Sequence, residues 1–237
     1  TLNGVLGGAG IGLTKVGAGT LVLGGANTYT GGTNVNGGTL KLGAGGVLAD
    51  TGAVTLADTA GVVLDVNGQT ETIGTLTGGA AAGISLGAGA LTVTQGADAT
   101  VAGVISGTGA SSLTKAGAST LTLSGANTYT GTTNVNAGTL SVTAANALHT
   151  GSSLVVNGGT LDINNVMLNT LAGASVQGMG QGVVGAITGT GAGAQYDGAI
   201  TLAGASTVGA ATGGGTDILT LNGVLGGAGI GLTKVGA

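Results

Sequence analysis

The sequence predicts an all-β chain folded as a right-handed parallel β-helix, a β-solenoid that continues as one tandem-repeat rod. Three observations lead to this prediction: a composition that can fill only a narrow core, short alternating apolar segments between glycines and asparagines, and repeats at two length scales. Of the 237 residues, 56 are glycine and only 5% are charged. Globular domains carry about a quarter charged residues, so an ordinary globular domain is a poor match.

The chain has little bulk with which to fill a wide interior. It contains no Phe, Trp, Pro, Cys or Arg, and its aromatic residues are Tyr29, Tyr129 and Tyr196. Aromatic side chains bury roughly 150–250 Å² each and supply much of the volume of a compact core. With Val, Ile, Leu and Ala in their place, we expect a core that is narrow and long. The lack of Cys also excludes a disulfide framework.

Short segments along the chain alternate apolar and polar residues, as in Thr20–Leu23, Thr39–Leu42 and Thr120–Leu123. Alternation with period two, rich in Val, Ile and Thr, is typical of half-buried strands. Gly and Asn between the segments supply the positive φ angles that tight corners need. Helix content should be near zero. If one coil takes about 20–25 residues, the repeat unit makes on the order of ten coils and a rod about 45–50 Å long.

The repeats define the expected units. Residues 220–237 copy residues 1–18 without a mismatch, so the sequence starts over at Thr220. We interpret residues 1–219 as one full solenoid unit and residues 220–237 as the start of the next identical unit. Inside the unit, sub-repeats 13–40 and 113–140 are identical at 22 of 28 positions. Duplication at two scales is typical of a rod that grows by copying units.

The repeated block also carries a family resemblance. The segment Gly17 to Leu42 has the sequence GAGTLVLGGANTYTGGTNVNGGTLKL, and Gly117 to Val142 is a second copy. Both resemble the passenger-associated strand repeat of bacterial autotransporters. Weaker similarity covers Glu71 to Leu76 and Val101 to Gly109. The resemblance implies a right-handed β-helix exported to the surface of a Gram-negative-type bacterium, and many such passengers are adhesins. It carries no catalytic residues over to this chain.

Asparagines and tyrosines recur at matched positions of the two blocks. We interpret them as structural residues, in which Tyr closes a corner over a coil and Asn bonds the turn backbone or stacks as a ladder. These residues are Asn27, Tyr29, Asn34, Asn36, Asn127, Tyr129, Asn134 and Asn136. The alternative interpretation makes Tyr29 and Tyr129 a sugar-stacking pair. Lysines recur at Lys15, Lys115 and Lys234, where we expect surface charges that prevent sideways strand pairing.

The remaining residue types argue against most other function classes. We expect no catalytic residues, no cofactor and no metal site. A polysaccharide-degrading enzyme is the enzymatic alternative, because four acids lie between Asp50 and Glu71, and Asp65 and Glu71 could lie on adjacent coils. Four lysines and no arginine leave no basic surface for nucleic acid. No run of 18 apolar residues is present, so the sequence predicts no helix inserted in a membrane.

The expected function is a structural or adhesive extracellular fibre segment, at the cell surface or in a matrix. Its expected partners are neighbouring identical units joined end to end, with lateral fibre bundling or host and cell-surface glycans as further possibilities. Besides the enzyme, two alternatives stay open. One is a carbohydrate-binding adhesin stalk. The other is a silk-like or amyloid stack, in which neighbouring strands come from separate chains instead of successive coils of one chain.

Overall fold

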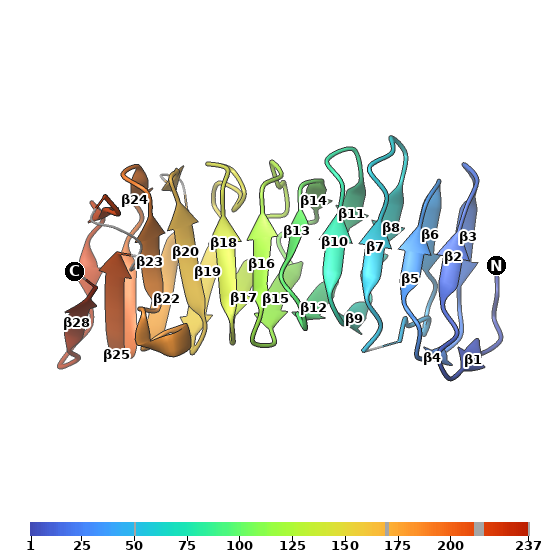
Figure 1. Ribbon diagram of the computed structural model, residues 1–237, viewed down its shortest axis with the longest axis horizontal. Coiled ribbons are helices and arrows are strands. Elements are labelled where there is room, and N and C mark those ends of the chain that lie inside the picture. The colour runs from blue at the N-terminus through green and yellow to red at the C-terminus, as the bar shows by residue number, and fades with distance from the viewer. Residues whose placement is uncertain (50, 169–170, 211–215, 237) are drawn as a thin grey trace.

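The computed structural model is a β-solenoid in which one backbone winds through successive coils, with the two termini at opposite ends of an elongated body (Figure 1). It describes residues 1–49, 51–168, 171–210 and 216–236. Strands of successive coils pair in parallel. Over the described residues the one helical element is a three-residue 3₁₀ turn, Gln181–Val183, and none of their helices is long and apolar enough to cross a membrane. The predicted all-β solenoid is confirmed.

Each coil visits three faces, which we call face 1, face 2 and face 3 in the order in which the chain reaches them. Face 1 begins where Leu2 bridges to Leu23. Two coils in the middle of the rod have no strand on face 1. There the Asn127 side chain of one coil donates a hydrogen bond to the Ala147 carbonyl oxygen of the next coil. The strands of face 1 are β3 (Thr20–Leu23), β6 (Thr39–Leu42), β8 (Val63–Asp65), β11 (Gly83–Ser85), β14 (Val104–Ser106), β21 (Met167–Leu168), β24 (Ala194–Tyr196) and β26 (Leu219–Leu221).

Face 2 follows face 1 in every coil. It opens with a separate two-stranded sheet and then continues as one ladder. Its strands are β1 (Gly7–Gly8), β4 (Thr28–Tyr29), β9 (Thr70–Ile73), β12 (Ala90–Thr94), β15 (Ser112–Ala116), β17 (Thr132–Val135), β19 (Ser153–Asn157), β22 (Gly173–Gly178), the first half of β25 (Ile200–Ala210) and β27 (Leu225–Gly226).

Face 3 is the most regular, with a strand in every coil. Its strands are β2 (Leu13–Lys15), β5 (Thr33–Val35), β7 (Val54–Leu56), β10 (Leu76–Gly78), β13 (Ala99–Val101), β16 (Thr120–Leu123), β18 (Thr139–Val142), β20 (Thr160–Asn164), β23 (Ile187–Thr190), the second half of β25 and β28 (Leu232–Val235). Because β25 pairs with both β22 and β23, faces 2 and 3 share it and form one 18-stranded sheet.

The long repeat is a whole number of coils. Along face 3 the pairing runs from β2 through nine intermediate strands to β28, which makes ten steps. Leu13, at the start of β2, and Leu232, at the start of β28, are equivalent positions of the identical segments 1–18 and 220–237. A unit therefore averages about 22 residues per coil, returns to the same face, and rises about 48 Å at the usual strand spacing. The predicted number of coils is confirmed.

The short repeat is not a whole number of coils. Five steps along face 3 lead from β2 to β16. The second copy of the Leu-Thr-Lys segment, however, is β15, which precedes β16 by one face. The offset between the two sub-repeats is therefore one face short of five coils. The two copies of the repeated block consequently occupy different faces of the same rod.

Aliphatic side chains at the inward positions of successive coils stack into continuous rows. On face 1, Leu40, Leu64 and Ile84 are adjacent in register, and each is at most 2% exposed. Burial of one such side chain stabilises the fold by about 1.5–3 kcal/mol. At corners the chain turns through residues with positive φ, and Gly138 shows why: its φ is +63°, and a Cβ there would clash with the carbonyl oxygen of Gly117 in the coil below. Close stacking at such corners requires glycine.

Candidate functional site

The repeated block places an asparagine side chain inside a corner, where it joins three coils. Asn27 is 5% exposed, and its Oδ1 accepts a hydrogen bond from the Leu6 amide at 2.9 Å. Its Nδ2 donates to the Val47 carbonyl oxygen at 2.7 Å. The first contact is to the coil below and the second to the coil above. A side-chain amide thus satisfies backbone groups at a corner where strand pairing is interrupted.

Asn127 repeats this arrangement on another face. Its Oδ1 accepts from the Ile105 amide at 2.8 Å, and its Nδ2 donates to the Ala147 carbonyl oxygen at 2.6 Å. Asn27 lies on face 2, beside β4, whereas Asn127 lies on face 1, above β14. The two sites have the same hydrogen-bonding pattern in different surroundings. The pattern is therefore set by the block itself and not by the face that it occupies.

Both repeated tyrosines are inside the coil. Tyr29 is 2% exposed and Tyr129 is fully buried. Each hydroxyl is 2.6 Å from the Oγ1 of a threonine four residues later, Thr33 or Thr133. Burial raises the pKa of Tyr129 to about 12 and also raises the pKa of Tyr29. A ring buried in this way presents no face to a sugar, so the sugar-stacking interpretation of the two tyrosines is wrong.

The other four predicted asparagines point away from the core. Asn34, Asn36 and Asn136 are exposed, and Asn134 is half-buried. Asn134 Nδ2 donates a long hydrogen bond, 3.4 Å, to Thr114 Oγ1 in the coil below. The structure therefore brings Asn27 together with Tyr29, and Asn127 with Tyr129, at the interior of a coil. It does not assemble Asn34, Asn36, Asn134 and Asn136 into a ladder, and a structural role for these four stays a prediction.

The repeated lysines differ most from their expected place. Lys15 is 6% exposed and Lys115 is fully buried, so the prediction of surface charges is wrong for both. Lys15 Nζ donates to the carbonyl oxygens of Val16 at 2.9 Å, Gly17 at 2.7 Å and Gly37 at 2.7 Å. Three acceptors match the three N–H groups of an ammonium. The charge is thereby compensated by backbone dipoles at a glycine-rich corner.

Lys115 has an equivalent set of acceptors. Its Nζ donates to the carbonyl oxygens of Ala116 at 2.9 Å, Gly117 at 2.8 Å and Ala137 at 3.0 Å. Burial lowers the pKa of Lys115 to about 8, and the negative charge of Asp98 acts in the opposite direction. In register, Lys115 lies between Val93 of the coil below and Val135 of the coil above. A charged side chain is thus built into an otherwise aliphatic row.

The acidic side chains of the described residues are scattered along the rod and do not converge. Asp65 points outward and forms an ion pair with Lys41 at 2.6 Å. Glu71 points inward, is 2% exposed, and its Oε1 accepts from the Leu48 amide at 2.9 Å. The two lie on different faces of one coil and not on adjacent coils, so the suggested acid pair is not formed. Asp50 lies outside the described residues.

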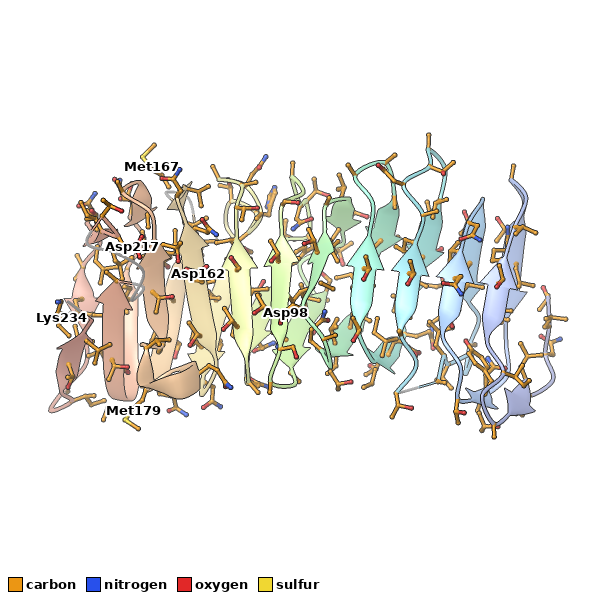
Figure 2. The ribbon with its side chains drawn as sticks, viewed as in Figure 1. Asp98, Asp162, Met167, Met179, Asp217 and Lys234 are labelled. Atoms are coloured by element: carbon orange, nitrogen blue, oxygen red, sulfur yellow. The ribbon has the colours of Figure 1, made fainter. Side chains whose placement is uncertain are left out.

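Three further carboxylates serve neighbouring coils, and Figure 2 shows them separated along the body. Asp98 Oδ1 accepts from the Thr120 amide and Asp217 Oδ1 from the Gly191 amide, both at 2.7 Å. Asp162 accepts from the hydroxyl of Ser141 at 2.9 Å. These carboxylates satisfy backbone or hydroxyl donors of adjacent coils. Such an arrangement suits a structural role.

Face 3 carries a row of outward-facing polar side chains, one from each successive coil, that was not singled out from the sequence. Its members are partners in register on successive coils and carry small hydrogen-bonding side chains: Thr14, Asn34, Thr55, Thr77, Thr100 and Thr122. Thr55 and Thr100 are exposed, and Thr77 and Thr122 are half-buried. Neighbouring members are about 4.8 Å apart, the spacing of paired strands. The signal in the sequence is a polar residue that recurs at the outward strand position once per coil.

Comparison with known proteins agrees with this architecture. A family model described as passenger-associated-transport-repeat matches residues 13–42 and 113–142. These are the blocks that contain Lys15, Asn27 and Tyr29 and their second copies. No solved structure matches the chain. The family match thus falls on the two blocks whose interior contacts are described above.

A curated relative covers more of the chain. The "Adhesin BmaC autotransporter" of Brucella suis biovar 1 (strain 1330) is 33% identical over 162 residues, which is 66% of this chain. The aligned region spans about 5% of the length of that protein. The repeats, the β-solenoid and this similarity agree with one another. Residues 13–42 and 113–142 are therefore repeats of the passenger-associated type, in a chain that is similar to part of a bacterial autotransporter adhesin.

Proposed function

We propose that this chain is a non-catalytic spacer segment of a surface-exposed adhesin, in which successive units equivalent to residues 1–219 continue as one rod. The observation that carries the proposal is the phase of the repeat, because ten coils return the chain to the face on which it started. A second unit can then begin with the same three faces in the same order. Each added unit extends the rod by about 48 Å.

The contents of the rod support a spacer more than an active site. The inward rows are aliphatic, and the polar side chains inside them satisfy backbone groups of the same or the next coil. The passenger-repeat match and the adhesin relative support a location outside a Gram-negative cell. The same proposal includes lateral bundling of such rods, through contacts between the outward-facing side chains of neighbouring rods.

Deletion of repeat sequence from the surface protein that contains this chain tests the spacer role. Removal of one unit, residues 1–219, should shorten the surface projection by about 48 Å, measured by atomic force microscopy on whole cells. Removal of residues 13–112 should shorten it by about 22 Å, because this offset is one face short of five coils. Adhesion to a flat ligand-coated surface should depend on length in both cases. A loss of soluble-ligand binding with unchanged projection length would contradict the proposal.

A glycan-binding segment is the second candidate, and the outward row on face 3 favours it. Regularly spaced hydroxyl and amide groups can donate to and accept from the hydroxyls of an extended polysaccharide. Replacement of Thr77 and Thr100 by Val together should abolish binding on a glycan array if this face binds sugar. Tyr129→Phe is the matched control, since it removes a buried hydroxyl and leaves the surface unchanged. An array without binding by the unaltered chain would exclude this candidate.

A further inference from the structure

Five asparagines of the chain are followed directly by glycine, a pair in which the asparagine side-chain amide is chemically labile. The backbone nitrogen of the next residue can attack the side-chain amide carbon, and glycine leaves that nitrogen unhindered and conformationally free. Asn3 and Asn222 are copies of one position in the two end coils. Asn36, Asn67 and Asn157 each have a coil on both sides, so their surroundings do not depend on the chain ends.

The fold holds both reacting groups of the Asn67–Gly68 pair. Asn67 Nδ2 donates a hydrogen bond to the Leu42 carbonyl oxygen at 2.9 Å. The Gly68 amide donates to the Leu86 carbonyl oxygen at 3.1 Å. Both hydrogen bonds have to break before the glycine nitrogen can reach the side-chain carbon, so the neighbouring coils protect this pair.

The Asn157–Gly158 pair is protected in the same way by one residue of the following coil. Asn157 Oδ1 accepts a hydrogen bond from Gln177 Nε2. The Gly158 amide donates to the Gln177 carbonyl oxygen at 3.3 Å. The side-chain amide and the glycine nitrogen are thus both fixed to a neighbouring strand.

The Asn36–Gly37 pair is held at neither reacting group. Asn36 is exposed, and within the described part of the chain neither its side-chain amide nor the Gly37 N–H forms a hydrogen bond. The backbone around the pair is nevertheless fixed to Lys15. The Asn36 amide donates to the Lys15 carbonyl oxygen at 2.8 Å, and the Gly37 carbonyl oxygen accepts from Lys15 Nζ at 2.7 Å. An open reaction site therefore adjoins an acceptor of a largely buried ammonium.

The second block provides a natural comparison, because there the same asparagine is followed by alanine. Asn136 is exposed, its amide donates to the Lys115 carbonyl oxygen at 2.9 Å, and the Ala137 carbonyl oxygen accepts from Lys115 Nζ at 3.0 Å. The Ala137 N–H, like that of Gly37, donates to no group among the residues that the structure describes. The Cβ of alanine next to the attacking nitrogen is the chemical difference between the two pairs.

We propose that Asn36 is a site of spontaneous deamidation in the folded chain, and that its counterpart Asn136 is protected. The Gly37 nitrogen loses its proton to hydroxide and forms a bond to Asn36 Cγ, and the side-chain nitrogen takes up a proton from water and leaves as ammonia. The product is a cyclic imide. Water then opens the imide at its side-chain carbonyl, which gives aspartate, or at its main-chain carbonyl, which gives isoaspartate. The net reaction consumes water, releases ammonia and involves no oxidation.

The two products differ in their effect on the Lys15 corner. In isoaspartate the main chain runs through the side-chain carbons, so the path to Gly37 is one atom longer. The Gly37 carbonyl oxygen is then displaced from Lys15 Nζ, which leaves one N–H of a largely buried ammonium without its acceptor. The aspartate product keeps the original backbone and this hydrogen bond. The inference goes beyond the spacer role and does not depend on it.

Incubation of the folded full chain at mildly alkaline pH tests the site, with the amide content of each asparagine followed by peptide mass spectrometry. Loss of the amide should be up to about tenfold faster at Asn36 than at Asn67 or Asn157, because those two sites must first break hydrogen bonds. In concentrated urea the three sites should react at similar rates, since each then precedes an unrestrained glycine. Equal rates in the folded chain, or a slower rate at Asn36, would overturn the proposal.

Two matched variants exchange the residues that the two blocks already carry at this position. Gly37→Ala should slow the loss at Asn36 to the rate at Asn136, and Ala137→Gly should raise the loss at Asn136 to the rate at Asn36. Rates that stay unchanged in both variants would overturn the proposal.

The effect on Lys15 has its own measurement. The aspartate and isoaspartate forms, once separated, are treated with an amine-acylating reagent, and Lys15 should be acylated several-fold faster in the isoaspartate form because it has lost one acceptor. Equal acylation of Lys15 in the two forms would overturn the predicted disturbance of this corner. None of these results bears on projection length at the cell surface, so the spacer proposal is judged separately.

Discussion

The two copies of the passenger-associated repeat are nearly the same sequence in two different places. Residues 13–42 begin on face 3 with β2, whereas residues 113–142 begin in the middle of the rod on face 2, within β15. Their asparagine, tyrosine and lysine contacts are nevertheless the same. The burial of the two lysines is similar: Lys15 is 6% exposed and Lys115 is fully buried. The motif therefore determines the contacts, whichever face it occupies.

The largest expected effect follows from reversal of the buried charge. Lys115→Glu places a carboxylate against three carbonyl oxygens in the middle of the core, and we expect a loss of about 3–5 kcal/mol in the free energy of unfolding. Lys15→Glu should also destabilise the fold, because the Lys15 ammonium donates to an equivalent set of three carbonyl oxygens. Urea titrations followed by circular dichroism measure both. A charge reversal at either lysine without loss of stability would contradict the comparison.

Removal of the corner asparagine should have the next largest effect. Asn127→Ala leaves the Ile105 amide and the Ala147 carbonyl oxygen without their partner, at about 1–3 kcal/mol for each buried group. Asn127→Asp keeps the acceptor and loses the donor, so it should retain part of the stability. Hydrogen exchange of the Ile105 amide reports the local effect directly. Unchanged protection of that amide in Asn127→Ala would show that the side chain does not hold the corner.

The tyrosine hydroxyl contributes less. Tyr129→Phe removes one hydrogen bond to Thr133 while it keeps the buried ring, and we expect a loss of about 1 kcal/mol. Tyr29→Phe should behave similarly, because its hydroxyl makes the same contact to Thr33. Thermal unfolding of the two variants side by side measures the difference. A loss several times larger would mean that the hydroxyl does more than bond to threonine.

A pH dependence should arise from Lys115. The folded state holds the pKa of Lys115 at about 8, below its unfolded value of 10.5. Between pH 8 and 9, below the range in which the tyrosines titrate, the Lys115 side chain therefore binds more protons in the unfolded chain than in the folded chain, and the free energy of unfolding should rise with pH. Lys115→Met should flatten that rise. The opposite slope in the unaltered chain would indicate that the carbonyl oxygens stabilise the ammonium more than burial disfavours it.

Much of the architecture could be predicted from the sequence. Alternating Thr and Leu, glycine-rich corners and the return of the first residues at Thr220 were enough for the solenoid and its ten coils. The buried lysines were mispredicted although a signal was present, since Leu13 and Lys15 have the same parity in a strand and must point to the same side. The general preference of lysine for the surface was given more weight than that parity.

The corner contacts could not be predicted in the same way. Asn27 binds Leu6 and Val47, which belong to the coils before and after its own, and such partners depend on the stacking register of whole coils. Register follows from the exact length of each coil, which varies along the chain. The one-face shift between the two blocks has the same origin, because the offset between them is not a whole number of coils.

The central claim is that residues 1–219 make ten coils and return to the same face. Small-angle X-ray scattering on matched chains with one and with two full units measures this most directly. The account predicts that the second unit adds about 48 Å to the maximum dimension and leaves the cross-sectional radius unchanged. A thicker particle of the same length, or an added length less than half or more than twice the predicted one, would contradict it.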